Sequence, residues 1–164
     1  MGTAMNAEIR LKNSELYIGG LVGVMRRTAS MQNGNDKNKH AHKSDWSTDA
    51  DGACAEMAAS KYLSIYWEPK VNAFKSPDLS NGWQVRSTNH QNGHLIVRGN
   101  DSDSDLFLLV VCNAPIFRLV GCMMGHEAKV EEFLHVGPYA DEARCWWVPQ
   151  NRLRDLPSFA GVTR

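Results

Sequence analysis

Ser-Pro-Asp-Leu-Ser-Asn-Gly-Trp-Gln-Val-Arg, residues 76–86, joins an acidic turn to a strand-like run that carries two polar side chains. The Asn-Gly pair marks a turn, and residues 83–88 favour a strand. Side chains two positions apart in a strand point to the same face. We therefore expect Gln84 and Arg86 side by side, close to Asp78 at the end of a neighbouring strand. An acid, an amide and a guanidinium would then gather at one place on a sheet.

Helical and strand-like patterns occupy different parts of the chain. Expected helices are residues 8–31 and 52–66, with short helical pieces at 127–135 and 151–156. Expected strands are residues 71–74, 83–88, 95–98, 106–112, 116–123 and 144–148. Helices followed by a mostly antiparallel run of strands predict an α+β fold.

The length of 164 residues predicts a single domain. Within it we expect an N-terminal helical segment (1–31) that packs on the core, a polar loop (32–51) and an α+β core (52–164). Gly19 and Gly23 recur one turn apart in the first helix. Because glycine destabilises an exposed helix by roughly 1 kcal/mol, this pair indicates either another element packed closely against the helix or a break in it.

Charge and apolar patterning exclude several classes of protein. Equal numbers of basic and acidic residues, 18 each, give a formal net charge of zero, which argues weakly against sequence-independent coating of DNA. No run of about 18 apolar residues predicts a membrane span, and the first residues lack the pattern of a signal peptide. The four cysteines are expected to be reduced and buried. These features favour a cytoplasmic protein without a membrane partner.

Residues 52–86 resemble the core of the PD-(D/E)XK nuclease superfamily, in the order that the superfamily uses. A helix carries the acid Glu56, a strand leads to a Pro-Asp pair that ends at Asp78, and the next strand carries Gln84 and Arg86. The resemblance implies a restriction-endonuclease-like core, in which a mixed central sheet is flanked by helices.

A longer resemblance covers most of residues 46–156. Here the chain looks like a group of uncharacterised proteins that are common in phages and prophages. The resemblance is carried by Gly-Ala-Cys-Ala-Glu-Met-Ala-Ala-Ser-Lys, by Val-Asn-Ala-Phe-Lys-Ser-Pro-Asp, by Gln-Val-Arg, by His-Leu-Ile-Val-Arg and by Trp-Trp-Val-Pro-Gln. It implies a phage protein that acts in the cytoplasm of the host cell.

The nuclease resemblance implies a metal-dependent DNA endonuclease that uses Mg²⁺ or Mn²⁺. Such an ion polarises a phosphate oxygen and lowers the pKa of the attacking water, and Mg²⁺ prefers oxygen ligands. The implied ligands are the side chains of Asp78, Gln84 and Glu56 and the backbone carbonyl of Val85. Arg86 would stabilise the charge that develops on the phosphate.

Two departures from the superfamily pattern lead to an alternative function. Gln84 replaces a carboxylate, and Arg86 replaces a lysine and cannot accept a proton. His90, in the loop after the strand, could supply the missing base, although a polar hairpin turn also accounts for it. The alternative is a catalytically silent nuclease-fold protein that binds nucleic acid or a host protein, such as a defence protein. Either form could be a homodimer.

Each candidate residue also has a plain structural interpretation. Pro-Asp pairs commonly form turns, which would account for Asp78. Glu56 could be an exposed helix charge. Gln84 and Arg86 could form the solvent face of a half-buried strand.

Two further motifs lie downstream. Asp101, Asp103 and Asp105 alternate with serines, but the glycine and glutamate of a calcium loop are missing, so an acidic turn is expected. Trp146 and Trp147 are adjacent and should face opposite sides of a strand. We expect one to lie in the core and the other to form a stacking or partner surface.

Overall fold

Two long helices and two sheets make up the computed structural model, which describes residues 6–33, 45–73, 76–135 and 144–156. The helices are α1 (Asn13–Gln32), α2 (Asp45–Leu63) and α3 (Gly125–Ala128), with 3₁₀ helices η1 (Glu131–Phe133) and η2 (Gln150–Arg152). The strands are β1 (Ala7–Arg10), β2 (Gln84–Thr88), β3 (Leu95–Arg98), β4 (Leu106–Asn113), β5 (Ile116–Met124), β6 (Leu134–His135) and β7 (Cys145–Val148).

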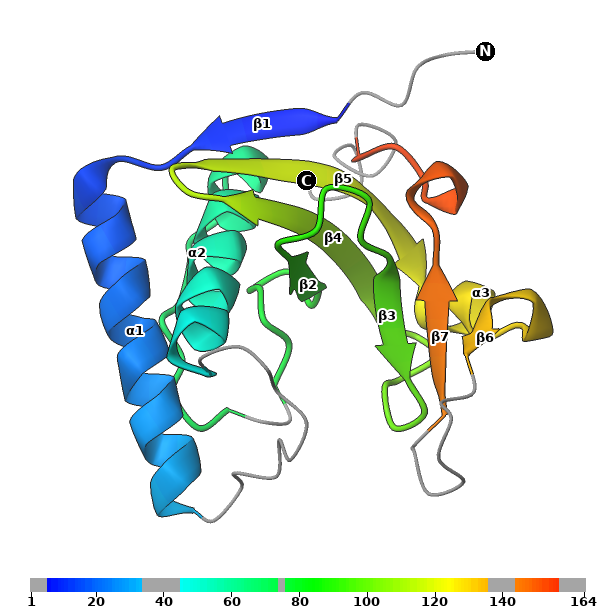
Figure 1. The fold of residues 1–164 in the computed structure, drawn as a ribbon, viewed down its shortest axis with the longest axis horizontal. Helices are drawn as coiled ribbons and strands as arrows, with labels where there is room; N and C mark the ends of the chain where they lie inside the picture. Colours follow the sequence, from blue (N-terminus) through cyan, green and yellow to red (C-terminus); the bar gives the residue numbers. More distant parts are fainter. Residues whose placement is uncertain (1–5, 34–44, 74–75, 136–143, 157–164) are drawn as a thin grey trace.

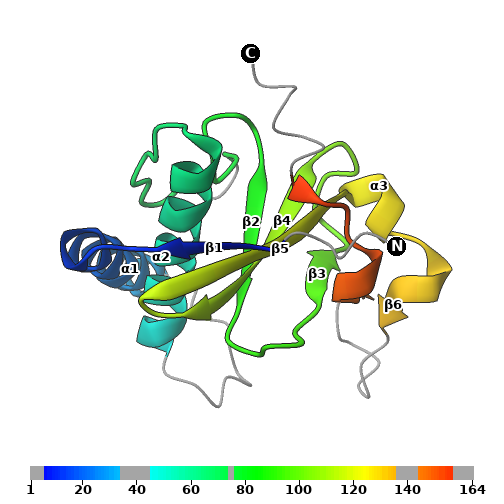
Figure 2. The same cartoon turned by 90° about the horizontal axis from the view of Figure 1, so that it is seen from above.

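The larger sheet is mixed and has the strand order β1-β5-β4-β2. Strands β1 and β4 pair antiparallel with β5, whereas the edge strand β2 pairs parallel with β4. Helix α2 covers one face of this sheet, and α1 packs on the outer side of α2 (Figure 1). The smaller antiparallel sheet, β3-β7-β6, lies on the other side (Figure 2). The expected α+β class, with a mixed sheet flanked by helices, is confirmed.

Strand β4 separates two hydrophobic cores. Leu106, Leu108 and Val110 pack into the core beneath α2. Phe107 and Leu109 pack into the second core, against the smaller sheet. Because successive side chains of a strand point to opposite faces, a strand covered on both faces is apolar at every position. This explains the continuous apolar run that the sequence shows here.

The two long helices approach closely at the predicted glycine pair. A Cβ on Gly23 would lie 2.4 Å from the Cα of Ala50 in α2, and a Cβ on Gly19 would lie 2.5 Å from Sγ of Cys54. The helix continues without a break from Asn13 to Gln32. Of the two alternatives, close packing by another element is therefore confirmed.

Gly23→Ala is expected to lower the free energy of unfolding, by about 1–3 kcal/mol, because the new methyl group would overlap the backbone of α2. Gly20→Ala is the matched control, since no atom lies within 4 Å of its added Cβ. There the better helix propensity of alanine should stabilise the protein by about 0.5–1 kcal/mol. Urea denaturation of both variants measures the difference. Equal effects of the two substitutions would contradict the close helix contact.

The prediction of a strand at residues 71–74 is wrong for residues 71–73, which the structure describes. Val71 and Asn72 form a bend, and Asn72 has a φ of 63°, which interrupts an extended chain. Phe74 lies outside the described residues. Asp78 is consequently presented by an irregular connection between α2 and β2 rather than by a strand end.

Three expected boundaries also differ from the structure. Residues 45–51 belong to α2 rather than to the polar loop; the first turn of α2 is exposed at Trp46 and Thr48 and so lacks apolar spacing. The chain before α1 forms strand β1 instead of starting the helix. The helical pieces at 127–135 and 151–156 are shorter, as α3, η1 and η2. Among the described helices, none is long and apolar enough to cross a membrane.

Candidate functional site

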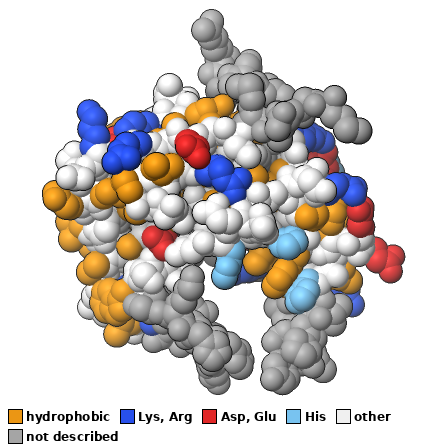
Figure 3. Space-filling view, turned by 45° about the horizontal axis from the view of Figure 1, so that its top comes forward, with side chains coloured by type: hydrophobic (Ala, Val, Ile, Leu, Met, Phe, Trp, Pro, Cys, Tyr) orange, Lys and Arg blue, Asp and Glu red, His pale blue; other side chains and the backbone are white. Residues whose placement is uncertain are grey.

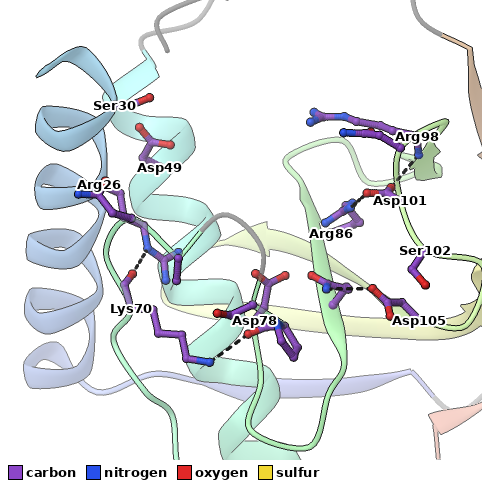
Figure 4. Close-up of a pocket in the computed structure, with 16 residues that line it drawn as sticks. Arg26, Ser30, Asp49, Lys70, Asp78, Arg86, Arg98, Asp101, Ser102 and Asp105 are labelled. Carbon is purple, nitrogen blue, oxygen red and sulfur yellow. Dashed lines mark hydrogen bonds and ion pairs between the residues drawn. The ribbon is translucent and has the colours of Figure 1, made fainter. Parts of the chain in front are cut away.

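A pocket of about 880 Å³ opens between the two long helices and the edge strand β2 (Figure 4). Asp78, Gln84 and Arg86, which the sequence predicts as neighbours, all line it. The pocket therefore brings together the acid, the amide and the guanidinium. Its charged lining residues are Arg26, Asp49 and Lys70 on the helix side, Asp78 between the walls, and Arg86, Arg98, Asp101 and Asp105 on the sheet side.

Asp78 is fixed to β2 by a backbone hydrogen bond. The N–H of Val85 donates to Oδ2 of Asp78 at 2.7 Å. The connection between α2 and β2 thus places the carboxylate beside the strand that carries the other two residues, although no strand leads to it. Burial, and next the negative charge of Glu56, raise the pKa of Asp78. Its charge is held in the pocket at a cost in stability, as is common for functional groups.

The backbone of Val85 also faces Asp78. In a strand the N–H and C=O groups of one residue point to the same side. The N–H of Val85 bonds to Asp78, so the carbonyl oxygen lies on the same open edge of β2. The Val85 carbonyl, which the family resemblance implies as a metal ligand, therefore lies on the side of β2 that faces Asp78.

Gln84 is oriented by an acid that the sequence does not predict as a site residue. Its side-chain amide nitrogen donates to Oδ2 of Asp105 at 3.1 Å. Because the nitrogen is used in this way, the carbonyl oxygen of the Gln84 amide remains as an acceptor. The superfamily pattern has a carboxylate where this chain has Gln84, and Asp105 places a carboxylate next to Gln84.

Arg86 is held against the sheet side of the pocket. Nη2 of Arg86 donates to Oδ1 of Asp101 at 2.9 Å, and the guanidinium carbon lies 5.0 Å from the ring centroid of Phe107. The backbone N–H of Arg98 donates to the other oxygen of Asp101 at 2.7 Å. The Asp101 carboxylate therefore holds Arg86 by its guanidinium group and Arg98 by its backbone N–H.

Glu56 is buried beside the pocket rather than in its lining. Nη1 and Nη2 of Arg26 donate to its two oxygens at 2.6 and 2.8 Å, and the indole N–H of Trp67 donates to Oε2 at 3.3 Å. The side chain is paired across the α1–α2 contact and does not line the pocket. Glu56 thus lies near Asp78, but both oxygens of Glu56 accept hydrogen bonds from other side chains.

A chain of hydrogen bonds runs from this ion pair to the residue before Asp78. Nε of Arg26 donates to the backbone oxygen of Lys70 at 2.8 Å. Nζ of Lys70 donates to the backbone oxygen of Pro77 at 3.2 Å (Figure 4). Glu56 and Arg26 therefore fix the irregular connection that carries Asp78.

His90 does not line the pocket that contains Asp78 and Gln84. It is exposed and lines a second pocket, which adjoins the first at Arg86 and Arg98. The structure does not bring His90 together with Asp78.

Six charged lining residues go beyond those that the sequence predicts. Asp101 and Asp105 are expected from the sequence only as parts of an acidic turn, and their alternation is the one local signal. Arg26 is the first of two adjacent arginines on α1, and Asp49 lies on α2. Lys70 lies in a loop and Arg98 at a strand end. Nothing in their local sequence distinguishes them from solvated charges.

The donor set fits a divalent cation that prefers oxygen ligands. Oxygens of Asp78, Gln84 and Asp105 line the same pocket, and such oxygens are the ligands that Mg²⁺ and Mn²⁺ accept. Within the described ranges, no three His, Cys, Asp or Glu residues cluster as metal ligands; the candidate set combines two carboxylates with an amide. Glu56 is not part of this set, because it does not line the pocket and both of its oxygens pair with the Arg26 guanidinium.

Asp78→Asn is expected to maintain or raise the stability of the protein. Folding raises the pKa of Asp78 above its ordinary value of 3.8, so the folded state binds the proton more tightly. The wild type therefore loses stability relative to the variant as the pH rises from about 4 through the raised pKa. Urea denaturation of both proteins at acidic and neutral pH measures the difference. A variant that is less stable at neutral pH than at acidic pH, relative to wild type, would contradict the assignment.

Comparison with known proteins gives no family for this chain. No protein-family model, no curated protein and no solved structure matches it.

Proposed function

We propose that the pocket binds a divalent cation and that the protein hydrolyses phosphodiester bonds in DNA, with a restriction-endonuclease-like core. The observation that carries the proposal is the position of Asp78. Its carboxylate is bonded to the β2 backbone at 2.7 Å, in the same pocket as the Gln84–Asp105 pair and two arginines.

Three side chains and one backbone group would hold the ion: Asp78, Gln84, Asp105 and the carbonyl of Val85. When bound, such an ion polarises a phosphate oxygen and lowers the pKa of an attacking water. Asp105 would take the place of the carboxylate that Gln84 lacks, so the set retains two negative charges. Glu56 is left out of this set of ligands, because it is paired with Arg26.

Arg86 and Arg98 would bind the phosphate. Arg86 is held by its ion pair with Asp101. An arginine held in this way loses little conformational entropy when it contacts a phosphate. A guanidinium group does not give up its proton in proteins, so Arg86 stabilises charge and does not transfer a proton.

Two of the carboxylates that line the pocket favour a bound cation. Asp101 is paired with Arg86, whereas Asp78 lies between the walls of the pocket and Asp105 lies on its sheet side (Figure 4). A phosphate placed between Asp78 and Asp105 would be repelled by their charges, although Arg86 and Arg98 at the pocket wall would attract it. A divalent cation between the two carboxylates would reverse the sign of that repulsion.

A second candidate function is binding without hydrolysis. The observation that favours it is the bidentate Glu56–Arg26 pair, which removes the helix acid from the implied metal site. In that case the pocket would still engage a phosphate through Arg86 and Arg98, and a host protein is an alternative partner. The two functions differ in whether DNA is cut.

The deciding experiment incubates the protein with labelled duplex, single-stranded and branched DNA, with Mg²⁺, with Mn²⁺ or with a chelator. Hydrolysis predicts product with Mg²⁺ or Mn²⁺ and none with the chelator. Glu8→Gln, which removes one charge from an exposed position of β1, should cleave as wild type does. DNA that is bound but remains intact with every ion would establish the second candidate in place of the first.

A further inference from the structure

A second pocket, of about 560 Å³, adjoins the first. Arg86 and Arg98 line both pockets, so a ligand whose charged group meets these arginines can extend into either one. On the face shown in Figure 3, histidine side chains gather around hydrophobic side chains at the edge of a hollow. The second pocket is thus continuous with the proposed phosphate site but differs from it in chemistry.

An exposed indole forms one side of this pocket. Trp147 of β7 pairs directly with Ile96 of β3, so the two side chains share a face of the smaller sheet. They are 38% and 36% exposed, whereas the neighbouring pair, Trp146 and Val97, packs into the second core. The prediction that the two tryptophans face opposite ways, one toward the core, is confirmed.

The indole is held in a fixed orientation. The His135 ring stacks on it, with ring centroids 4.1 Å apart and an interplanar angle of 19°, and the indole N–H donates to Sγ of Cys145 at 3.2 Å. His94 lies at 5.9 Å, tilted by 43°, and lines the pocket, whereas His135 does not. An aromatic ring that is fixed in advance loses little entropy when a flat ligand stacks on it.

The charge of this pocket suits an anion. Arg86, Arg98, His90 and His94 are its ionisable lining residues, and the described residues that line it include no carboxylate. Stacking surfaces combined with arginine are the usual means by which proteins bind single-stranded nucleic acid. A base inside a duplex has both faces covered by its neighbours, so an unpaired base is the form that can stack freely on Trp147.

We propose that this second pocket binds an unpaired base of a DNA strand, stacked against Trp147 and Ile96, while the adjacent phosphate contacts Arg98 and Arg86. The inference rests on the proposed function and narrows its substrate to DNA that carries a single-stranded end or an unpaired segment. Trp147 acts here as a binding residue that places the neighbouring phosphodiester at the first pocket.

The test measures binding of a short, fluorescently labelled single strand by anisotropy, in the presence of a chelator so that no cleavage occurs. Trp147→Ala should weaken binding by about 5- to 150-fold, the effect of losing one stacked base, and Trp147→Phe should restore part of it. Trp46→Ala, which removes an exposed tryptophan of α2 outside the pocket, is the matched control and should bind as wild type does.

A second arm uses the wild-type protein alone and so does not depend on the folding of a variant. A strand of the same length that lacks its bases should bind as weakly as Trp147→Ala binds the intact strand. Equal affinity for strands with and without bases, or equal affinity of Trp147→Ala and wild type, would overturn the inference. So would a blunt duplex, or the mononucleotide dAMP, that binds as tightly as the single strand.

These outcomes are separate from those of the cleavage assay. Binding that depends on Trp147, together with intact DNA under every ion, would support the base site and overturn the proposed hydrolysis. Metal-dependent cleavage, together with equal binding by Trp147→Ala and wild type, would support the proposed hydrolysis and overturn the base site.

Discussion

Arg26→Met is expected to lower the free energy of unfolding by about 3–5 kcal/mol, because it leaves a buried carboxylate without its partner. The side chain of Glu56 is 8% exposed and that of Arg26 is 23% exposed. The same substitution removes the bond from Arg26 to the backbone of Lys70, which holds the connection leading to Asp78. The loss should therefore affect both the helix contact and the pocket.

Urea denaturation measures this effect, and the Lys61–Glu15 pair provides the control. That pair also joins α2 to α1, at 2.9 Å, but its side chains are 38% and 27% exposed. Lys61→Met should cost less than about 1 kcal/mol, since exposed ion pairs contribute little. The double variant Arg26→Met/Glu56→Met should recover much of the loss, because no charge remains buried. A cost for Arg26→Met as small as that for Lys61→Met would contradict the structural role of the pair.

Asp78→Asn is expected to reduce metal-dependent cleavage by at least about a hundredfold. Loss of a charged ligand weakens the hold on an ion whose contribution to catalysis is several kcal/mol, and each 1.36 kcal/mol corresponds to a factor of ten. The amide of asparagine can still accept the hydrogen bond from Val85, so the connection should keep its place. Cleavage should fall while stability holds or rises, which separates a functional loss from unfolding.

Initial cleavage rates with Mn²⁺, measured beside denaturation curves of the same preparations, check this expectation. Glu8→Gln removes the same charge from an exposed position and should leave the rate unchanged. Full activity of Asp78→Asn would remove Asp78 from the reaction, and equal losses in both variants would point to net charge rather than to the site.

Local patterns predict much of the sheet and the centre of the site. Turn signals and short apolar runs locate β2, β3, β4, β5 and β7 to within one or two residues, because each strand alternates or is buried on both faces. The i, i+2 spacing of Gln84 and Arg86 predicts that they share a face, and both line the pocket with Asp78. The glycine pair of α1 predicts either a closely packed neighbour or a break in the helix, and the structure decides for the close neighbour.

Long-range contacts are what the sequence does not predict. The partner of Glu56 is Arg26, 30 positions earlier, and the partner of Gln84 is Asp105, 21 positions later. Neither pairing leaves a local pattern, since an arginine on a helix and an acid in a turn are usually solvated. The polar first turn of α2 is missed for a related reason, because an exposed helix end has no apolar spacing.

Binding of Mn²⁺ tests the central claim most directly, because it does not depend on the choice of DNA substrate. Isothermal titration calorimetry of the protein without DNA should show one saturable Mn²⁺ site per chain. Affinity should be at least about tenfold weaker in Asp78→Asn and unchanged in Glu8→Gln. A protein that shows no saturable Mn²⁺ binding, or an Asp78→Asn variant that binds Mn²⁺ as tightly as wild type, would contradict a metal site at Asp78.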